Sequence, residues 1–258
     1  MKIISYNLWV GGTTDNKNKD NLTSIINTLE SLHPDLVVLQ EANHFEQDCL
    51  EPLHFLGRQL GLDHRVLSEA TMRGSGNQYH TALLCRYPVE VTPFKGMHHS
   101  AFISNVAYPS GPFTLAGAHL CPSSEQTRTE EIEKILSLYP DLVIGDFNMI
   151  NPVDSYESDL AALKAKNLFV ENGKICTQAY DSISQRGYKD VALTLNKEPE
   201  RTFPTPASPY ASDGLTFRLD YAFCRPGFLP RVKSFHVVKN PLSEQASDHF
   251  PIVIEIQS

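Results

Sequence analysis

The sequence lacks the features of secreted, disulfide-bonded and membrane-spanning proteins. It contains no run of about 18 consecutive apolar residues, so an ordinary transmembrane helix is not expected. The first residues include no apolar segment long enough for a signal peptide. The five cysteines are odd in number and none form a C-x-x-C pair, which argues against a disulfide framework. We therefore expect reduced, mostly buried thiols and a cytoplasmic location.

Positive charge is also scarce. The chain has 22 Lys and Arg residues against 30 Asp and Glu residues, which gives a formal net charge of -8. An acidic surface repels phosphate backbones, so a protein that coats nucleic acid non-specifically is disfavoured. A cleft that is locally basic, or that binds a metal ion, is still compatible with this charge.

The length of the chain allows either one α/β sandwich or two small domains. Hydrophobic residues make up 41% of its 258 residues, enough to fill a substantial core. No linker separates two halves, and the one stretch with a loop-like composition is residues 199–214. We therefore expect a single domain that spans residues 1–258.

Apolar periodicity predicts that strands and helices alternate. The pattern of a strand, an amphipathic helix and a buried strand occurs twice, in residues 2–40 and in residues 112–144. The second helix is expected to present Ile132, Ile135 and Tyr139 on one face. Further strands are predicted at residues 81–85, 217–224 and 251–256. This pattern indicates an α/β fold in which two sheets pack together and helices lie outside.

Polar side chains recur where the predicted strands end. They are Asn7, Glu41, His119, Asp146 with Asn148, Asp220, and Asp248 with His249. Strand ends in α/β folds converge on one edge, so these side chains can meet in one pocket. Glu41 and Asp248 offer the carboxylate oxygens that Mg²⁺ prefers. Asn148, His249 and His119 can donate hydrogen bonds to phosphate oxygens, whereas Asp146 can accept one from water.

These residues lie within short motifs that resemble those of the endonuclease/exonuclease/phosphatase superfamily, in the family's order from residue 5 to residue 252. The motifs are Ser5-Tyr6-Asn7, Leu39-Gln40-Glu41, Ala118-His119-Leu120, Gly145-Asp146-Phe147-Asn148, Arg218-Leu219-Asp220-Tyr221 and Ser247-Asp248-His249-Phe250-Pro251-Ile252. The resemblance implies a four-layer α/β sandwich of two packed mixed β-sheets flanked by helices. It also implies a monomeric, divalent-metal-dependent hydrolase that cleaves phosphoester bonds by in-line attack of water.

The resemblance further implies a role for each residue at the metal end of the site. Glu41 would bind Mg²⁺ or Mn²⁺ directly and Asp248 would share in the metal site. Asn7 would act at the same end, through the phosphate or through a metal-bound water.

The remaining roles concern water and phosphate. Asp146 would orient or deprotonate the attacking water, and Asn148 would bind a phosphate oxygen. His249 would contact the scissile phosphate with its ring held by Asp220, and His119 would give a second phosphate contact.

Arg128 is a candidate from its spacing alone. It lies four residues before Ile132, so on a helix it shares the inward face and can reach a phosphate. The alternative is a salt bridge to an acid of the first sheet.

The sequence departs from some family members at two points. Abasic-site endonucleases have an acid two residues after the first-strand asparagine, where this chain has Trp9, which weakens that assignment. In pancreatic deoxyribonuclease the histidine that matches His119 has a glutamate partner, whereas residues 78–81 contain no acid. The protonation state of His119 is therefore open.

Several of these residues also have a purely structural interpretation. Asp146 and Asn148 can form an Asx-turn that closes a strand, and His119 can be a core histidine. Trp9, Tyr79 and Phe203 can form a stacking floor for a planar group, although such aromatics more often only pack. The pair His98-His99 is expected on the surface, because adjacent residues on a strand point to opposite faces.

Three functions compete. The leading one is a nuclease or phosphodiesterase that acts on nucleic-acid ends or nucleotides, with DNA or RNA as partner. The second is a phosphomonoesterase, or a lipid or inositol-phosphate phosphoesterase, on the same scaffold. No amphipathic helix stands out that would favour a lipid, so no membrane partner is expected. The third, an inactive binding protein, is disfavoured because every element that hydrolysis requires is present. We expect residues 203–210 to determine substrate specificity.

Overall fold

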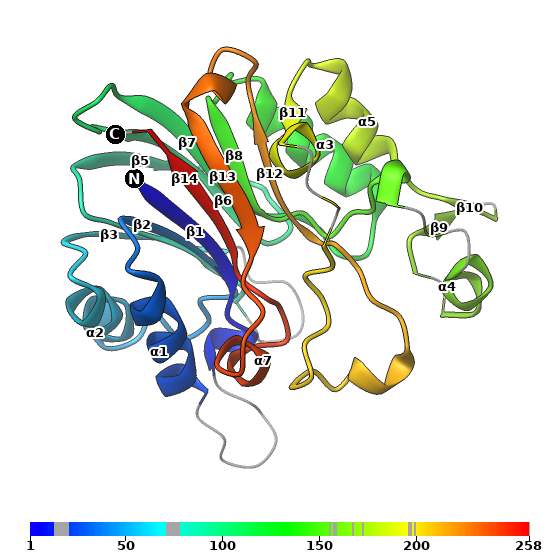
Figure 1. The fold of residues 1–258 in the computed structure, drawn as a ribbon, viewed down its shortest axis with the longest axis horizontal. Coiled ribbons are helices and arrows are strands. Elements are labelled where there is room, and N and C mark those ends of the chain that lie inside the picture. Colours follow the sequence, from blue (N-terminus) through cyan, green and yellow to red (C-terminus); the bar gives the residue numbers. More distant parts are fainter. Residues whose placement is uncertain are drawn as a thin grey trace.

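The protein folds into two six-stranded mixed sheets that pack face to face, with helices on both outer faces (Figure 1). This arrangement confirms the predicted four-layer α/β sandwich. The computed structural model describes residues 1–12, 21–70, 78–154, 156, 159–166, 168–171, 173–195, 198 and 200–257.

The first sheet has the strand order β13-β14-β1-β2-β4-β3. β1 runs parallel to β2 and antiparallel to β14, so the N-terminal and C-terminal strands lie side by side. Its strands are β1 (Lys2–Asn7), β2 (Leu36–Gln40), β3 (His64–Ser68), β4 (Thr81–Cys85), β13 (Val232–Val237) and β14 (Ile252–Ile256).

The second sheet has the strand order β11-β12-β8-β7-β6-β5. β7 and β8 are parallel, and the other described pairs are antiparallel. Its strands are β5 (Val89–Pro93), β6 (Ser100–Val106), β7 (Phe113–His119), β8 (Leu142–Asp146), β11 (Lys189–Asp190) and β12 (Asp220–Cys224). The strand predicted at residues 217–224 therefore begins later, at Asp220.

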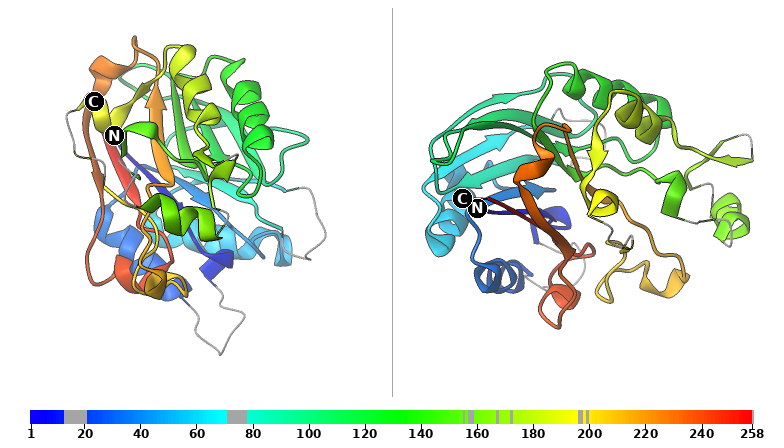
Figure 2. Two further views of the ribbon diagram at one scale, coloured as in Figure 1. Left: turned by 90° about the vertical axis from the view of Figure 1, so that its right-hand side faces the viewer. Right: turned by 45° about the horizontal axis from the view of Figure 1, so that its top comes forward.

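Helices cover the outer faces of the sheets, as the two views of Figure 2 show. Apolar residues of α1 (Leu22–Leu32) and α2 (Glu51–Leu60) pack on the first sheet, and those of α3 (Glu125–Leu136) and α5 (Gln178–Gln185) pack on the second. The second predicted helix ends earlier than expected, because Tyr139 lies beyond α3 and is 66% exposed. The remaining helices are α4 (Leu160–Lys166), α6 (Val191–Thr194) and α7 (Ser243–Ala246).

Short elements complete the chain. A small hairpin is formed by β9 (Val170–Glu171) and β10 (Lys174–Ile175), and it lies near α4 in Figure 1. The 3-10 turns are Val10–Gly12, Asp48–Leu50, Pro152–Asp154, Ala211–Asp213 and Leu229–Arg231.

The core between the sheets explains why the central strands are apolar without interruption. All residues of β2, β4, β8 and β12 are buried, because one face of each strand meets the other sheet and the opposite face meets helices. The sheets approach closely at Gly117, where an added Cβ would lie 2.4 Å from the Phe102 ring and 2.8 Å from Val38. Among the described residues, no helix has the length and apolar character that a membrane span requires.

Candidate active site

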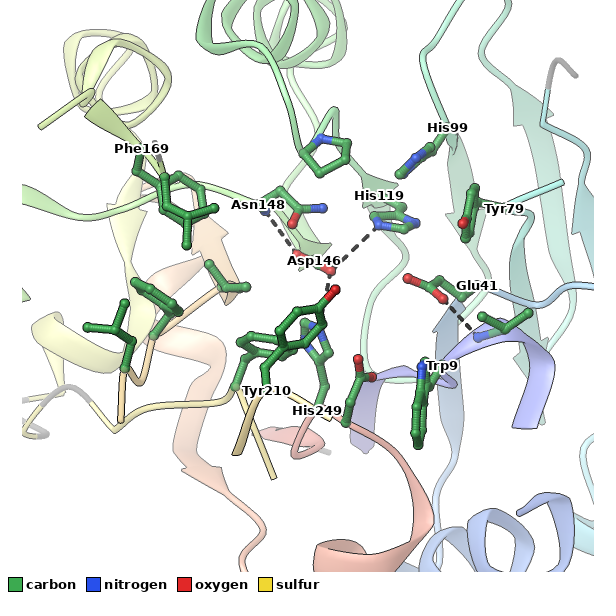
Figure 3. Close-up of a pocket in the computed structure, with 18 of the residues that line it drawn as sticks. Trp9, Glu41, Tyr79, His99, His119, Asp146, Asn148, Phe169, Tyr210 and His249 are labelled. Atoms are coloured by element: carbon green, nitrogen blue, oxygen red, sulfur yellow. Dashed lines mark hydrogen bonds and ion pairs between the residues drawn. The ribbon is translucent and has the colours of Figure 1, made fainter. Parts of the chain in front are cut away.

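The polar side chains at the strand ends gather around one cavity of about 570 Å³ (Figure 3). Six of the predicted residues line it: Glu41, His119, Asp146, Asn148, Asp248 and His249. Asn7 and Asp220 are buried directly behind them, at 0% and 1% exposure. The structure therefore brings together all the predicted strand-end residues, six as lining and two as support.

Strand register sets the central part of the site. His119, Asp146 and Asp220 lie opposite one another on β7, β8 and β12. Gly145 is required just before Asp146, because its φ of 152° is unfavourable for other residues and an added Cβ would lie 1.9 Å from the Ala118 carbonyl oxygen. The alternation of a strand then brings Asp146 to the cavity rather than to the helix side.

The Asp146 carboxylate lies at the centre of the site, within 4 Å of polar atoms of Asn7, His119 and His249. Its Oδ2 accepts a hydrogen bond from Asn7 Nδ2 at 3.0 Å and lies 3.6 Å from His119 Nε2 and 3.8 Å from His249 Nε2. Its Oδ1 accepts from the Asn148 backbone N–H at 2.9 Å, which is the Asx-turn that the sequence allowed. Burial raises the pKa of Asp146, and the charge on His249 acts in the opposite direction.

Asn148 is held in an uncommon backbone conformation, with φ of 47°. Its Nδ2 donates to the Leu120 carbonyl at 3.1 Å, which leaves one amide hydrogen for a ligand in the cavity.

His249 is fixed by Asp220. Nδ1 of His249 lies 2.8 Å from Asp220 Oδ2, and both groups are buried. Because a carboxylate only accepts, Nδ1 carries a hydrogen and Nε2 faces Asp146 and the cavity. Burial alone would lower the pKa of His249, but the charges of Asp220 and Asp146 raise it from 6.5 to about 10.

His119 has different surroundings. Burial lowers its pKa well below 6.5, and the neighbouring histidines His99 and His249 act in the same direction. Its Nδ1 is buried and finds no hydrogen-bond partner among the described residues. Burial therefore favours the neutral form of the His119 ring, for which residues 78–81 offer no acid partner.

Glu41 and Asp248 offer carboxylates to the same cavity. Glu41 has a φ of 53°, and its Oε2 accepts from the Val10 backbone N–H at 2.8 Å. Burial and the charge of Asp248 raise the pKa of Glu41, and burial raises that of Asp248. Glu41 is half-buried and Asp248 is buried. Two acids that repel each other and offer only oxygen ligands fit a hard divalent cation such as Mg²⁺ or Mn²⁺.

A second group also has cation-binding spacing. Ligand atoms of Asp146, Asp220 and His249 all lie within 4.8 Å of one another. Within this group, the Asp220 carboxylate holds His249 Nδ1, and the Asp146 carboxylate and His249 Nε2 face the cavity.

Asn7 does not line the cavity. Its Nδ2 donates to both Glu41 Oε1, at 3.3 Å, and Asp146 Oδ2, while its Oδ1 accepts from the Trp9 backbone N–H at 3.0 Å. The role predicted for Asn7 at the phosphate or a metal-bound water stays a prediction. The amide joins the first-sheet acid to the second-sheet acid.

Arg128 is not brought to the cavity either. Its buried guanidinium binds Glu125 Oε2 at 2.8 Å and the Cys121 carbonyl. The partner is an acid one turn earlier on α3 rather than an acid of the first sheet. A phosphate contact would require Arg128 to leave this ion pair, so the structure gives it no support.

The expectation for His98-His99 is wrong. Both residues line the cavity, and His99 is only 7% exposed. The segment before β6 passes over the cavity wall, where the His99 ring packs 4.1 Å from His119 and 4.7 Å from Tyr79. The pairing of β6 with β7 places them there, and the sequence carried no local signal of it.

Sequence reasoning also missed most of the apolar end of the cavity. Phe203 and Tyr210, which line this end, belong to the segment 203–210 that was expected to determine specificity; the residues that were missed are Leu168, Phe169, Leu215, Phe217 and Leu219. The three aromatics considered for stacking do not form one floor, because Tyr79 lies beside His99 whereas Phe203 lies 4.9 Å from the His249 ring. Phe217 and Leu219, just before Asp220, carried no sequence signal that separates them from core residues.

The chain is similar to known proteins in sequence and in fold. The model of the endonuclease/exonuclease/phosphatase family matches residues 4–249. The comparison with curated proteins gives no match.

Similar solved structures include an AP endonuclease from Archaeoglobus fulgidus, with a TM-score of 0.72, 20% identity and 100% of each chain covered. The 3′ phosphatase NExo from Neisseria, bound to a product DNA hairpin, has a TM-score of 0.68, 18% identity and 100% of each chain covered. TDP2 from D. rerio, complexed with a single-strand DNA product, has a TM-score of 0.64 and 20% identity, and the match covers 100% of this chain and 99% of that chain.

At these identities the solved structures establish the shared fold, and the family follows from the sequence match along almost the whole chain. The chain therefore belongs to the endonuclease/exonuclease/phosphatase family and is a metal-dependent phosphoesterase.

Proposed function

We propose that the protein hydrolyses phosphoester bonds at nucleic-acid ends or in nucleotides, with Mg²⁺ or Mn²⁺ held by Glu41 and Asp248. The observation that carries this proposal is the position of Asp146, which faces the same cavity as both acids and lies within 4 Å of His119 and His249. Neighbours of similar fold were solved with DNA products, which supports nucleic-acid ends as the substrate class.

Each side chain has a distinct task in this proposal. Asp146 orients the attacking water and accepts its proton. His249 donates from Nε2 to a non-bridging phosphate oxygen while Asp220 holds the ring. The neutral His119 and the free amide hydrogen of Asn148 donate to the same phosphate. The bound cation supplies positive charge that offsets the negative charge of the phosphoryl group.

Metal dependence is the first test. Hydrolysis of a panel of single-stranded DNA, duplex DNA, RNA and nucleotides should require Mg²⁺ or Mn²⁺ and stop with chelator. Glu41→Gln and Asp248→Asn should raise the metal concentration required for half-maximal activity, because each removes a charged oxygen ligand. Full activity in excess chelator contradicts the proposal, and tightly bound zinc that co-purifies would contradict the choice of ion.

The roles of Asp146 and His249 are tested by separating turnover from binding. Asp146→Asn and His249→Ala should each lower kcat far more than they weaken substrate binding, because both act where charge develops. Asp63→Asn and His236→Ala are matched controls, since both residues are exposed and lie outside the cavity lining. A change of only a few-fold in kcat would remove that residue from the mechanism.

We also propose that the protein works as a monomer in the cytoplasm. Four of the five cysteines are buried free thiols, which supports a reducing compartment. Light scattering at assay concentrations tests the oligomeric state, and a stable dimer would contradict it.

A further inference from the structure

We propose that the apolar end of the cavity binds an uncharged planar group attached to the scissile phosphate and selects against a second negative charge there. This apolar chamber consists of Phe169, Phe203, Leu215, Phe217 and Leu219. The proposal rests on the proposed function, because it assumes that phosphate binds between Asp146 and His249.

The apolar chamber lies directly beside His249 of the proposed reaction centre. The Phe203 ring lies 4.9 Å from the His249 ring and 6.4 Å from the Phe217 ring, and Phe169 lies 5.5 Å from Phe217. In Figure 3, Phe169 lies at one end of the cavity and Tyr79 with Trp9 at the other, with Asp146 between them. A ring attached to phosphate at Asp146 therefore reaches aromatic and aliphatic side chains as soon as it enters the chamber.

Charge at this end is unfavourable for an anion. Among the residues that the structure describes, no lysine or arginine lines the cavity. Asp213 does line it, and its carboxylate binds Lys166 at 2.8 Å. A second phosphate would meet this acid and would have no lining cation to bind it.

The cations packed around the chamber are each bound to an acid. Arg128, whose guanidinium lies 5.7 Å from the Phe169 ring, binds Glu125. Arg218, between two chamber residues in sequence, binds Asp154 at 2.8 Å and is buried. Their charge stabilises the fold rather than a ligand. Among its described lining residues, the chamber thus offers apolar contact and no compensating positive charge, which favours an uncharged ring.

Binding of non-hydrolysable phosphonates tests the proposal directly. The single tryptophan of the chain, Trp9, lines the cavity, so its fluorescence can report binding in the presence of Mg²⁺ without any turnover. Phenylphosphonate should bind at least about tenfold more tightly than methylphosphonate, and 4-carboxyphenylphosphonate should lose that gain. Comparison with a thymidine 5′-phosphonate then shows whether the chamber binds a base that is carried on a sugar or only a ring that is attached directly to phosphorus.

Three variants locate the effect. Phe169→Ser should reduce the affinity of phenylphosphonate relative to methylphosphonate several-fold. Tyr79→Ser, at the opposite end of the cavity, should leave this ratio of affinities unchanged. Asp213→Asn should reduce the difference in affinity between phenylphosphonate and 4-carboxyphenylphosphonate. Asp63→Asn, at an exposed residue, is the matched control.

The proposal is overturned if phenylphosphonate binds no more tightly than methylphosphonate, if the carboxyphenyl ligand binds as tightly as the phenyl ligand, or if only Tyr79→Ser removes the advantage. Failure of the proposed function would look different. In that case no phosphoester in the panel is hydrolysed, whatever the order of phosphonate affinities.

Discussion

Replacing His99 with phenylalanine should make the protein less sensitive to acid. The His99 ring is 7% exposed and packs against Tyr79, His98 and His119, with centroid distances of 4.7, 4.7 and 4.1 Å. Burial, together with repulsion from His98, lowers the pKa of His99 from 6.5 to about 3. The unfolded chain binds a proton more readily than the folded one. The stability that the neutral ring provides is therefore complete above pH 6.5 and is lost as the pH falls towards 3.

The size of the effect follows from these two values. Each pKa unit corresponds to about 1.4 kcal/mol, so between about pH 8 and about pH 4 the folded state loses on the order of 3 kcal/mol through His99. His99→Phe keeps a ring of similar shape and removes the titration. The variant should therefore gain on the order of 3 kcal/mol of unfolding free energy relative to the wild type as the pH falls through this range.

Urea unfolding followed by circular dichroism at several pH values measures this difference, provided that the m-values of the two proteins agree. His236→Phe is the control, because His236 is exposed on β13. The reasoning is refuted if the difference between His99→Phe and the wild type changes by less than about 1 kcal/mol over the range.

Three further outcomes are expected. Arg218→Met should cost roughly 3–5 kcal/mol in urea unfolding, because it removes the guanidinium that binds the buried Asp154 and Asp190 at 2.8 and 2.9 Å and leaves Asp154 only the more distant Arg201, at 3.6 Å; a loss below about 1 kcal/mol would contradict this. A thiol reagent should modify the exposed Cys49 rapidly and the four buried cysteines only after unfolding. Salt titration of oligonucleotide binding to Asp146→Asn should give a slope for about two to four phosphates, and six or more would contradict it.

The strand-end residues could be predicted because their signal is local. Asp146 follows a continuous apolar strand and Glu41 follows another, and strand ends of this fold class meet at one edge. The sequence pattern predicts the types of residue in the site and the edge of the sheets at which they meet. It does not predict which side chain lines the cavity, and Asn7 lies behind Glu41 and Asp146 and donates to both.

The apolar end and the histidine wall could not be predicted for a different reason. Phe217 and Leu219 are 4% and 5% exposed, so by composition they are indistinguishable from core residues. His99 reaches the cavity through the pairing of β6 with β7, which depends on contacts between distant parts of the sequence. Arg128 has the inward-facing position that its spacing indicated, but its nearest acid is on its own helix.

The site depends on how the two sheets pack, because its two halves come from different sheets. Glu41 follows β2 of the first sheet and Asp146 ends β8 of the second, and the Asn7 amide donates to both carboxylates. A shift of one sheet against the other would lengthen one of these hydrogen bonds and change the distance between the metal end and the water-activating end. The close approach at Gly117 restricts such a shift, since its missing side chain lets the second sheet meet the first where an added Cβ would lie 2.8 Å from Val38. Packing in the core between the sheets therefore controls the geometry of catalysis as well as stability.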